Sequence, residues 1–110
     1  MRAVTITANG WVRGLELDAG DHRATHPATL ALRHNLDLWY RDSAANPEAE
    51  LNMAAMALAV AASDHDPHDL PLICGDAIVV AIDPATTAPA GMTTAQYHAL
   101  SYPLRSSHAA

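Results

Sequence analysis

The chain opens with two short segments of strand character around a turn. Residues 3–7 are rich in β-branched side chains, and residues 11–17 again have the pattern of an extended segment. Asn9-Gly10 stands between them, and this dipeptide is strongly preferred in the type I′ turn of a two-residue hairpin loop. The pattern therefore predicts an antiparallel β-hairpin over residues 3–17.

The predicted turn also sets the register of the hairpin. A two-residue loop places Ile6 opposite Arg13 and Val4 opposite Leu15, so that these side chains share one face. Arg13 then interrupts an otherwise apolar face. The usual explanation is an edge strand whose arginine reaches water, and the functional alternative is a guanidinium that clamps a phosphate or a carboxylate.

Two further elements are predicted before residue 43. Residues 27–34 form a short amphipathic pattern with Pro27 in the first turn, which predicts a helix. Residues 35–42 alternate apolar and polar side chains with a period of two, which favours a strand. A continuation of the preceding helix is the competing interpretation.

Residues 47–63 predict the main helix of the chain. Strong helix formers fill the segment, Pro47 suits its first turn, and Glu48 and Glu50 stand where the helix dipole favours acids. Alanine, methionine, leucine and valine occupy nearly all the other positions. A helix that is apolar on nearly all sides is typically buried or lies at an oligomer contact.

The remaining pattern completes an α+β fold. Residues 77–82 form a continuous apolar run, typical of a fully buried strand, and residues 93–101 suggest a short helix. We expect a small, mostly antiparallel sheet, made of the N-terminal hairpin and two or more further strands, packed by the Ala/Met-rich helix and one or two short helices. Residues 1–104 are expected to form a single domain, and residues 105–110 a frayed tail.

Length and composition narrow the class of protein. The chain has 110 residues, one cysteine and no apolar run near the ~18 residues that suggest a membrane span. Its start lacks the basic and apolar regions of a secretory signal. Because a lone cysteine excludes an intrachain disulfide and suits a reducing compartment, we expect a cytoplasmic protein.

Negative charge gathers in the second part of the chain. The formal net charge is -6, and residues 42–104 contain eight acidic residues but neither arginine nor lysine. Such a segment cannot neutralise phosphates, which argues against direct nucleic-acid binding. A solvated acidic surface is the simplest interpretation. The alternative is an electronegative face that binds a basic partner, and the residues selected for it are Asp64, Asp66, Asp69, Glu48 and Glu50.

One loop suggests a metal site. His65 and His68 stand among aspartates, and imidazole and carboxylate ligands together suit zinc or manganese. Pro67 opposes a helix that would present both histidines on one side. These two residues are therefore weak metal candidates, and a surface turn is the competing interpretation.

A nucleotide pocket is the second ligand hypothesis. Partly buried guanidinium groups can bind phosphate, and a tryptophan ring can stack on a base. The core is the alternative place for Trp11 and Trp39, because the chain has few large side chains. If the first half of the chain lines one cleft, the residues of the pocket are Arg13, Arg33, Arg41, Trp39 and Asn52.

The sequence lacks common catalytic motifs. It contains no Gly-x-Ser-x-Gly, no phosphate-binding Gly-rich loop and no His-Glu-x-x-His. Cys74 follows an apolar run and is better explained as an inert buried thiol than as a nucleophile. We therefore expect a protein without enzymatic activity and without a cofactor.

Four features occur together along the chain: a basic residue before the first strand, an Asn-Gly hairpin, an asparagine that starts an Ala-rich helix, and Gly-Asp before a late strand. Here they are Arg2, Asn9-Gly10, Asn52 and Gly75-Asp76. With them the chain resembles a family of short, uncharacterised proteins of actinobacteria and their phages and plasmids, grouped as a domain of unknown function. The resemblance covers residues 1 to about 83, and the loop of residues 64–69 departs from it. It implies a mobile-element protein that blocks a host defence by binding.

These observations predict a non-enzymatic acidic protein that inhibits a host or cellular protein through an electronegative face. The first alternative is a small-ligand protein that holds a nucleotide in the Arg/Trp pocket. The second is a metal-dependent enzyme at the loop of His65 and His68. We expect neither direct nucleic-acid binding nor a role at a membrane. Exposed sheet edges and the apolar helix also favour a homodimer.

Overall fold

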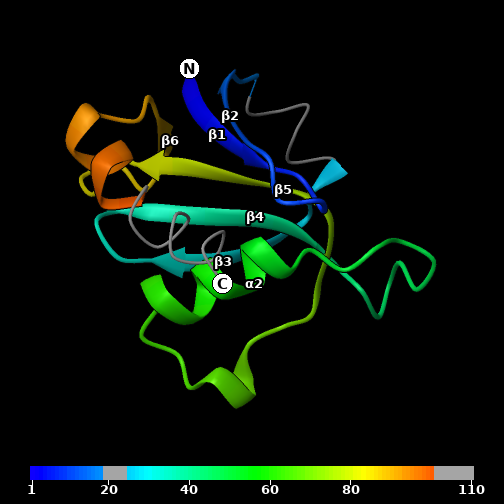
Figure 1. The fold of residues 1–110 in the computed structure, drawn as a ribbon. Helices are drawn as coiled ribbons and strands as arrows, with labels where there is room; N and C mark the ends of the chain where they lie inside the picture. Colours follow the sequence, from blue (N-terminus) through cyan, green and yellow to red (C-terminus); the bar gives the residue numbers. More distant parts are fainter. Residues whose placement is uncertain (19–24, 101–110) are drawn as a thin grey trace.

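Six strands form one antiparallel sheet in the computed structural model, which describes residues 1–18 and 25–100 (Figure 1). The sheet order is β2-β1-β5-β4-β3, and β6 pairs with the end of β5. The strands are β1 (Arg2–Ile6), β2 (Val12–Glu16), β3 (Ala28–Leu32), β4 (Leu36–Asp42), β5 (Ile73–Ile82) and β6 (Pro89–Ala90).

Helices cover one face of this sheet and one of its ends. Helix α2 (Met53–Ala62) packs below the sheet in the view of Figure 1, and the 3₁₀ turn η1 (Pro67–Asp69) follows it in the connection to β5. Residues 94–100 form a further short helix. The α+β class expected from the sequence is confirmed. The expected tail of residues 105–110 lies outside the described residues.

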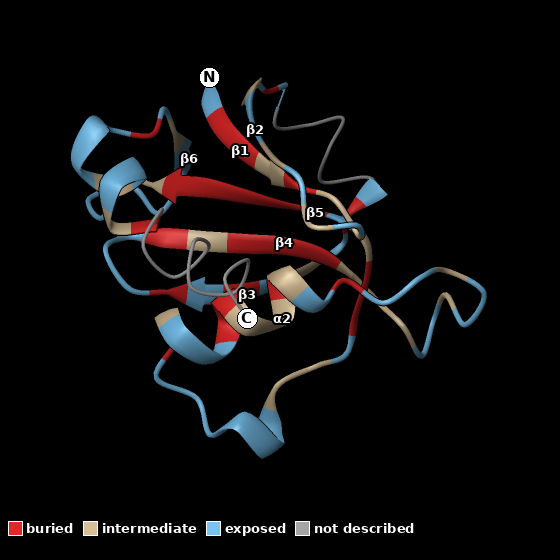
Figure 2. Ribbon diagram, in the orientation of Figure 1, coloured by how far each residue is buried: buried red, intermediate tan, exposed pale blue. Residues whose placement is uncertain are grey.

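The centre of the sheet is buried on both faces. Strand β5 lies between β1 and β4 and is buried along most of its length, as Figure 2 shows. Ala77, Val79 and Ala81 belong to the core that includes α2, whereas Ile78 and Val80 belong to the core on the opposite face. Two buried faces explain why this strand is a continuous apolar run rather than an alternating one.

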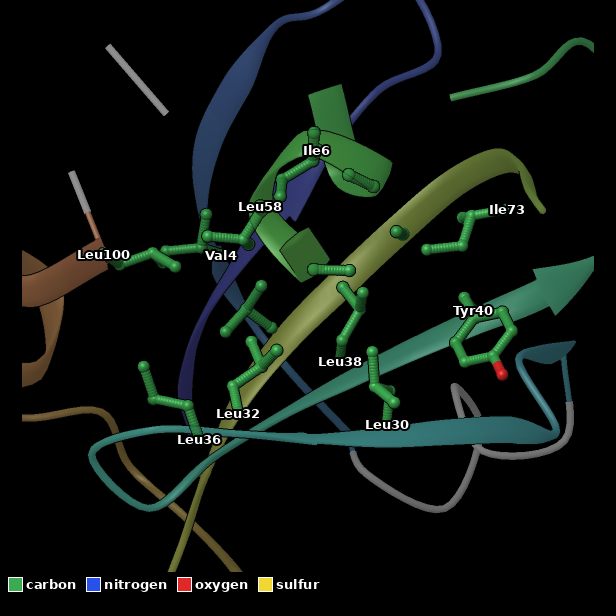
Figure 3. Packing of buried hydrophobic residues seen from close by; sticks show 14 of the residues in the cluster. Val4, Ile6, Leu30, Leu32, Leu36, Leu38, Tyr40, Leu58, Ile73 and Leu100 are labelled. Atoms are coloured by element: carbon green, nitrogen blue, oxygen red, sulfur yellow. The ribbon is translucent and has the colours of Figure 1, made fainter. Parts of the chain in front are cut away.

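The two cores differ in what fills them. On the α2 side, Leu58 lies among side chains of β1, β3 and β4 (Figure 3). On the opposite face, Trp39 of β4 is the largest buried side chain and packs with Ala3, Ile78 and Val80. Of the two alternatives considered for Trp39, a core residue or a stacking surface for a ligand, the structure has the core residue.

The hairpin forms, but the predicted register is wrong by one residue. The Gly10 N–H donates to the Thr7 carbonyl at 2.9 Å, and the Thr7 N–H donates to the Trp11 carbonyl at 2.9 Å, so the loop has three residues. Gly10 has a φ of 91°, which suits the left-handed bulge position of such a loop.

This register changes the surroundings of Arg13. Ile6 pairs with Val12, Val4 pairs with Gly14, and Arg13 pairs with Thr5. Because a shift of one residue moves a side chain to the other face of the sheet, Arg13 does not interrupt the apolar face of Val4 and Ile6. It lies on the face of Thr5 and is exposed.

The helix predicted over residues 27–34 is wrong, because the segment forms strand β3. Its side chains alternate: Leu30 and Leu32 are buried in the α2-side core, and Thr29 and Ala31 are exposed. Pairing of the whole of β3 with β4 outweighs the helix propensity of alanine and leucine. The strand predicted over residues 35–42 is confirmed as β4.

The main helix begins later than predicted. Residues 47–51 form turns and a single bridge, and α2 starts only after its N-cap Asn52. Glu48 and Glu50 therefore do not stand in the first helical turn. None of the helices in the described part of the chain has the length and apolar character of a transmembrane span.

Tyr40 leads to a prediction about stability at high pH. Burial raises the pKa of the Tyr40 phenol above its ordinary value of 10.0, and the carboxylate of Asp42 raises it further. The unfolded chain ionises this phenol near its ordinary pKa while the folded chain keeps it neutral. The contribution of Tyr40 is thus complete below pH 10.0 and is lost as the pH rises above that value. Tyrosinate absorbance during a pH titration should show a step at high pH that Tyr40→Phe removes; titration curves that are the same with and without Tyr40→Phe in this late region would contradict the assignment.

Candidate protein-binding surface

The exposed side of α2 is apolar. The helix contains no charged residue, and its buried side consists of Ala55, Leu58 and Ala59. Met53 and Val60 are seven positions apart and therefore lie on one side of the helix, where they are 65% and 51% exposed. Single exposed apolar residues are ordinary, but a helix side without any charge is typical of a binding surface.

Two exposed leucines lie near the start of the helix. Leu51 precedes the cap residue and pairs with Cys74 in an antiparallel bridge. Leu72 lies two residues before Cys74, and its carbonyl accepts the Ser43 N–H at 2.9 Å. We call the exposed side chains of Met53 and Val60 the α2 surface.

Asn52 holds α2 in place on the sheet. Its Oδ1 accepts the Ala55 N–H at 2.9 Å, which caps the helix. Its Nδ2 donates to the carbonyls of Ile6 and Gly75, each at 2.9 Å. The side chain is fully buried, and both amide protons are used within the chain. Asn52 therefore anchors the helix to β1 and β5, rather than lining a ligand pocket as the nucleotide hypothesis required.

Acidic loops lie at the two ends of α2. Glu48 and Glu50 belong to the loop before the helix, and Asp64, Asp66 and Asp69 belong to the loop after it; all five are exposed (Figure 2). The two loops project from different parts of the fold (Figure 1). The acids therefore form two groups that border the α2 surface, not the single electronegative face expected from the sequence.

Part of the negative charge is compensated within the chain. The Arg33 guanidinium lies 2.9 Å from Asp64 Oδ1 and also donates to the Ala61 carbonyl at 3.0 Å. Asp66 Oδ1 accepts the His68 N–H at 2.9 Å and so caps η1. Arg33 thus joins the end of β3 to the end of α2 and reduces the charge that Asp64 offers to a partner.

The residues selected for a nucleotide pocket are not brought together. Trp39 is 2% exposed on the sheet face opposite α2, whereas Asn52 lies at the start of α2. Arg13 is exposed on β2, and Arg41 Nε donates to the Thr25 carbonyl at 3.0 Å. None of the selected residues lines either of two hollows, of about 460 Å³ and 340 Å³, in the described part of the chain.

The loop selected for a metal site is a polar surface loop. His65 and His68 are both exposed, and Pro67–Asp69 forms η1. Among residues 1–18 and 25–100, no group of three or more His, Cys, Asp or Glu side chains is arranged to hold a metal ion. Cys74 is buried, and its Sγ donates to the Arg41 carbonyl at 3.5 Å.

One buried polar residue, His26, was not among the functional candidates of the sequence. Its Nε2 lies 3.0 Å from the Asp76 carbonyl, and its Nδ1 lies 2.8 Å from Thr25 Oγ1. Because a carbonyl only accepts, Nε2 carries the proton, and the ring attaches the start of β3 to β5. No local pattern marks this role, since the contact joins residues fifty positions apart.

Comparison of the chain with protein-family models, with curated proteins and with solved structures finds no match. The surface chemistry of this chain is therefore the remaining indication of its function. The feature that stands out is the combination of an uncharged, exposed helix side and acidic loops at its two ends.

Proposed function

We propose that this chain is a non-enzymatic protein-binding protein whose contact is the α2 surface. The observation that carries the proposal is the exposure of Met53 and Val60 on a helix side without charge. Burying what remains exposed of two such side chains in a complex contributes about 1–2 kcal/mol for each of them. The resemblance noted in the sequence adds that the partner is a host protein that the chain inhibits.

The acidic loops specify a basic partner. Glu48 and Glu50 stand at one end of the α2 surface, and Asp66 and Asp69 stand at the other, all of them exposed. A segment with an apolar centre and lysine or arginine at its ends matches this layout, because opposite charges at the rim speed encounter and set the register. Two copies of the α2 surface do not complement each other, because pairing them along the helix would bring their acidic loops together.

Synthetic peptides test the charge preference. The first carries apolar side chains at helical spacing and lysines at both ends, and the second replaces the lysines by glutamates. We expect fluorescence anisotropy to show binding of the basic peptide, weakened by added salt, and no binding of the acidic one. Equal binding of both peptides, or of neither, would contradict the proposal.

A single substitution tests the position of the contact. Val60→Glu should weaken binding of the basic peptide by about tenfold or more, because it places a charge in the apolar contact. Thr29→Glu is the matched control, since it adds the same charge at an exposed position of β3. Proteins captured from a host lysate by the native chain but not by Val60→Glu then identify the partner. Equal affinity of native chain and Val60→Glu would reject the α2 surface as the contact.

A further inference from the structure

Strand β2 presents an open edge with a definite set of backbone groups. The Thr7 N–H donates to the Trp11 carbonyl at 2.9 Å, and the Leu17 N–H donates to the Met1 carbonyl at 2.8 Å. Hydrogen-bonded pairs recur at every second position of an antiparallel ladder, so residues 11, 13, 15 and 17 direct their backbone groups to β1. Val12, Gly14 and Glu16 therefore direct theirs outward. Within the described residues, no strand pairs with this edge.

This edge lacks two of the usual protections against pairing. Edge strands commonly carry proline, a bulge or charged side chains, and of these β2 has only the charges of Arg13 and Glu16. Between Val12 and Glu16, β2 has no proline, and its pairing with β1 is regular. Gly14 faces open space, because a Cβ atom placed there would meet nothing within 4 Å. Trp11, just before the strand, is 61% exposed.

We propose that β2 pairs with β2 of a second copy of this chain, antiparallel and centred on Gly14. A two-fold axis perpendicular to the sheet makes such a pair, and it keeps α2 of both copies on the same side of one continuous sheet. Gly14 then pairs with Gly14 of the partner, and Val12 pairs with Glu16 of the partner. All the outward backbone groups of residues 12, 14 and 16 are satisfied in this register.

Charge supports the same register. Centred on Gly14, the pair places Arg13 opposite Leu15 of the partner and Glu16 opposite Val12 of the partner, so no like charges face each other. Centring on Arg13 or on Glu16 would set two arginines or two glutamates directly opposite, which is destabilising. Centring on Leu15 would pair only residues 14–16 within the strand and would leave Val12 opposite Asp18, whereas centring on Gly14 pairs the whole of residues 12–16.

The register also accounts for the exposed tryptophan. In this register Trp11 lies opposite Leu17 of the partner. Both side chains are on the face of the sheet that carries Arg13 and, opposite it, Leu15 of the partner. The aromatic ring thereby gains an apolar cross-strand neighbour, a favourable pair in antiparallel sheets. The α2 surface of each copy stays accessible, so this contact is independent of the proposed partner binding.

Proline at the central position tests the backbone pairing. Gly14→Pro removes an outward N–H and no bond to β1, as edge strands tolerate. Sedimentation velocity over a range of concentrations should show a monomer–dimer equilibrium for the native chain and for Gly14→Ala. Gly14→Pro should raise the dissociation constant of the dimer about tenfold or more. A native chain that is monomeric at all concentrations, or a dimer unaffected by Gly14→Pro, would overturn the proposal.

A charge pair at Val12 tests the register without changing the backbone. Val12→Lys stands opposite Glu16 of the partner and should strengthen the dimer, whereas Val12→Glu should weaken it severalfold. Thr29→Lys and Thr29→Glu change the net charge equally on the other edge of the sheet and are the controls. The Val12 variants should differ by more than the Thr29 variants. Equal differences at the two positions would show that net charge alone is responsible and would reject the register.

Discussion

Replacing Asn52 by alanine is expected to lower the free energy of unfolding by about 3 kcal/mol or more. The substitution removes the cap on Ala55, which is typically worth about 1 kcal/mol. It also removes both donors to the carbonyls of Ile6 and Gly75, and each carbonyl left without its partner costs about 1–3 kcal/mol. The side chain is fully buried, so water cannot replace it without rearrangement.

Two further variants separate the contributions of this side chain. Asn52→Asp keeps the capping oxygen but sets a carboxylate against two carbonyls, so its loss of stability should be at least as large as that of Asn52→Ala near neutral pH. Asn46→Ala is the control, since Asn46 makes one hydrogen bond to the Asp42 carbonyl in a half-buried loop. Chemical denaturation gives the differences. A cost below about 1 kcal/mol for Asn52→Ala would contradict the anchoring role.

The two tryptophans should differ sharply when each is replaced by alanine. Trp39 is 2% exposed at the centre of the second core, and truncation of such a ring costs about 3–5 kcal/mol. Trp11 is 61% exposed, so Trp11→Ala should change the stability of the monomer by less than about 0.5 kcal/mol. Thermal unfolding at low protein concentration keeps any dimer contribution out of the comparison.

Fluorescence quenching checks the same assignment without a stability measurement. In Trp11→Phe, the remaining Trp39 should be protected from acrylamide, whereas in Trp39→Phe the remaining Trp11 should be readily quenched. A Trp39 ring that is quenched as readily as Trp11 would mean that it is open to ligands. The nucleotide hypothesis would then regain its stacking surface.

The pattern of apolar and polar residues correctly predicted those strands whose burial is visible in their own residues. The alternation of residues 35–42 and the apolar run of residues 77–82 indicated β4 and the main part of β5. Each pattern reflects how many faces of its own strand are buried, and so it can be recognised within the segment itself. Asn52 was noted in the sequence as the start of the Ala-rich helix, and capping explains that start. Its two bonds to other strands could not be foreseen.

Two errors show where local patterns are insufficient. Residues 28–32 have good helix formers, yet pairing with β4 makes them a strand. Asn9-Gly10 suits a two-residue turn, yet the hairpin uses a three-residue loop and shifts its register. In both cases several turn or element types are close in intrinsic free energy, and contacts distant in the sequence select one of them.

The binding surface illustrates the same division. The absence of charge in residues 53–62 and the acidic content of the flanking segments are properties of the sequence, and they are the basis of the proposed contact and of the charge expected of its partner. Which side of α2 faces solvent, how the acids divide between its ends and which backbone groups of β2 point outward follow from the tertiary structure. Side-chain chemistry is a property of each residue, whereas exposure and register depend on which distant segments pack together, and so only the folded chain decides them.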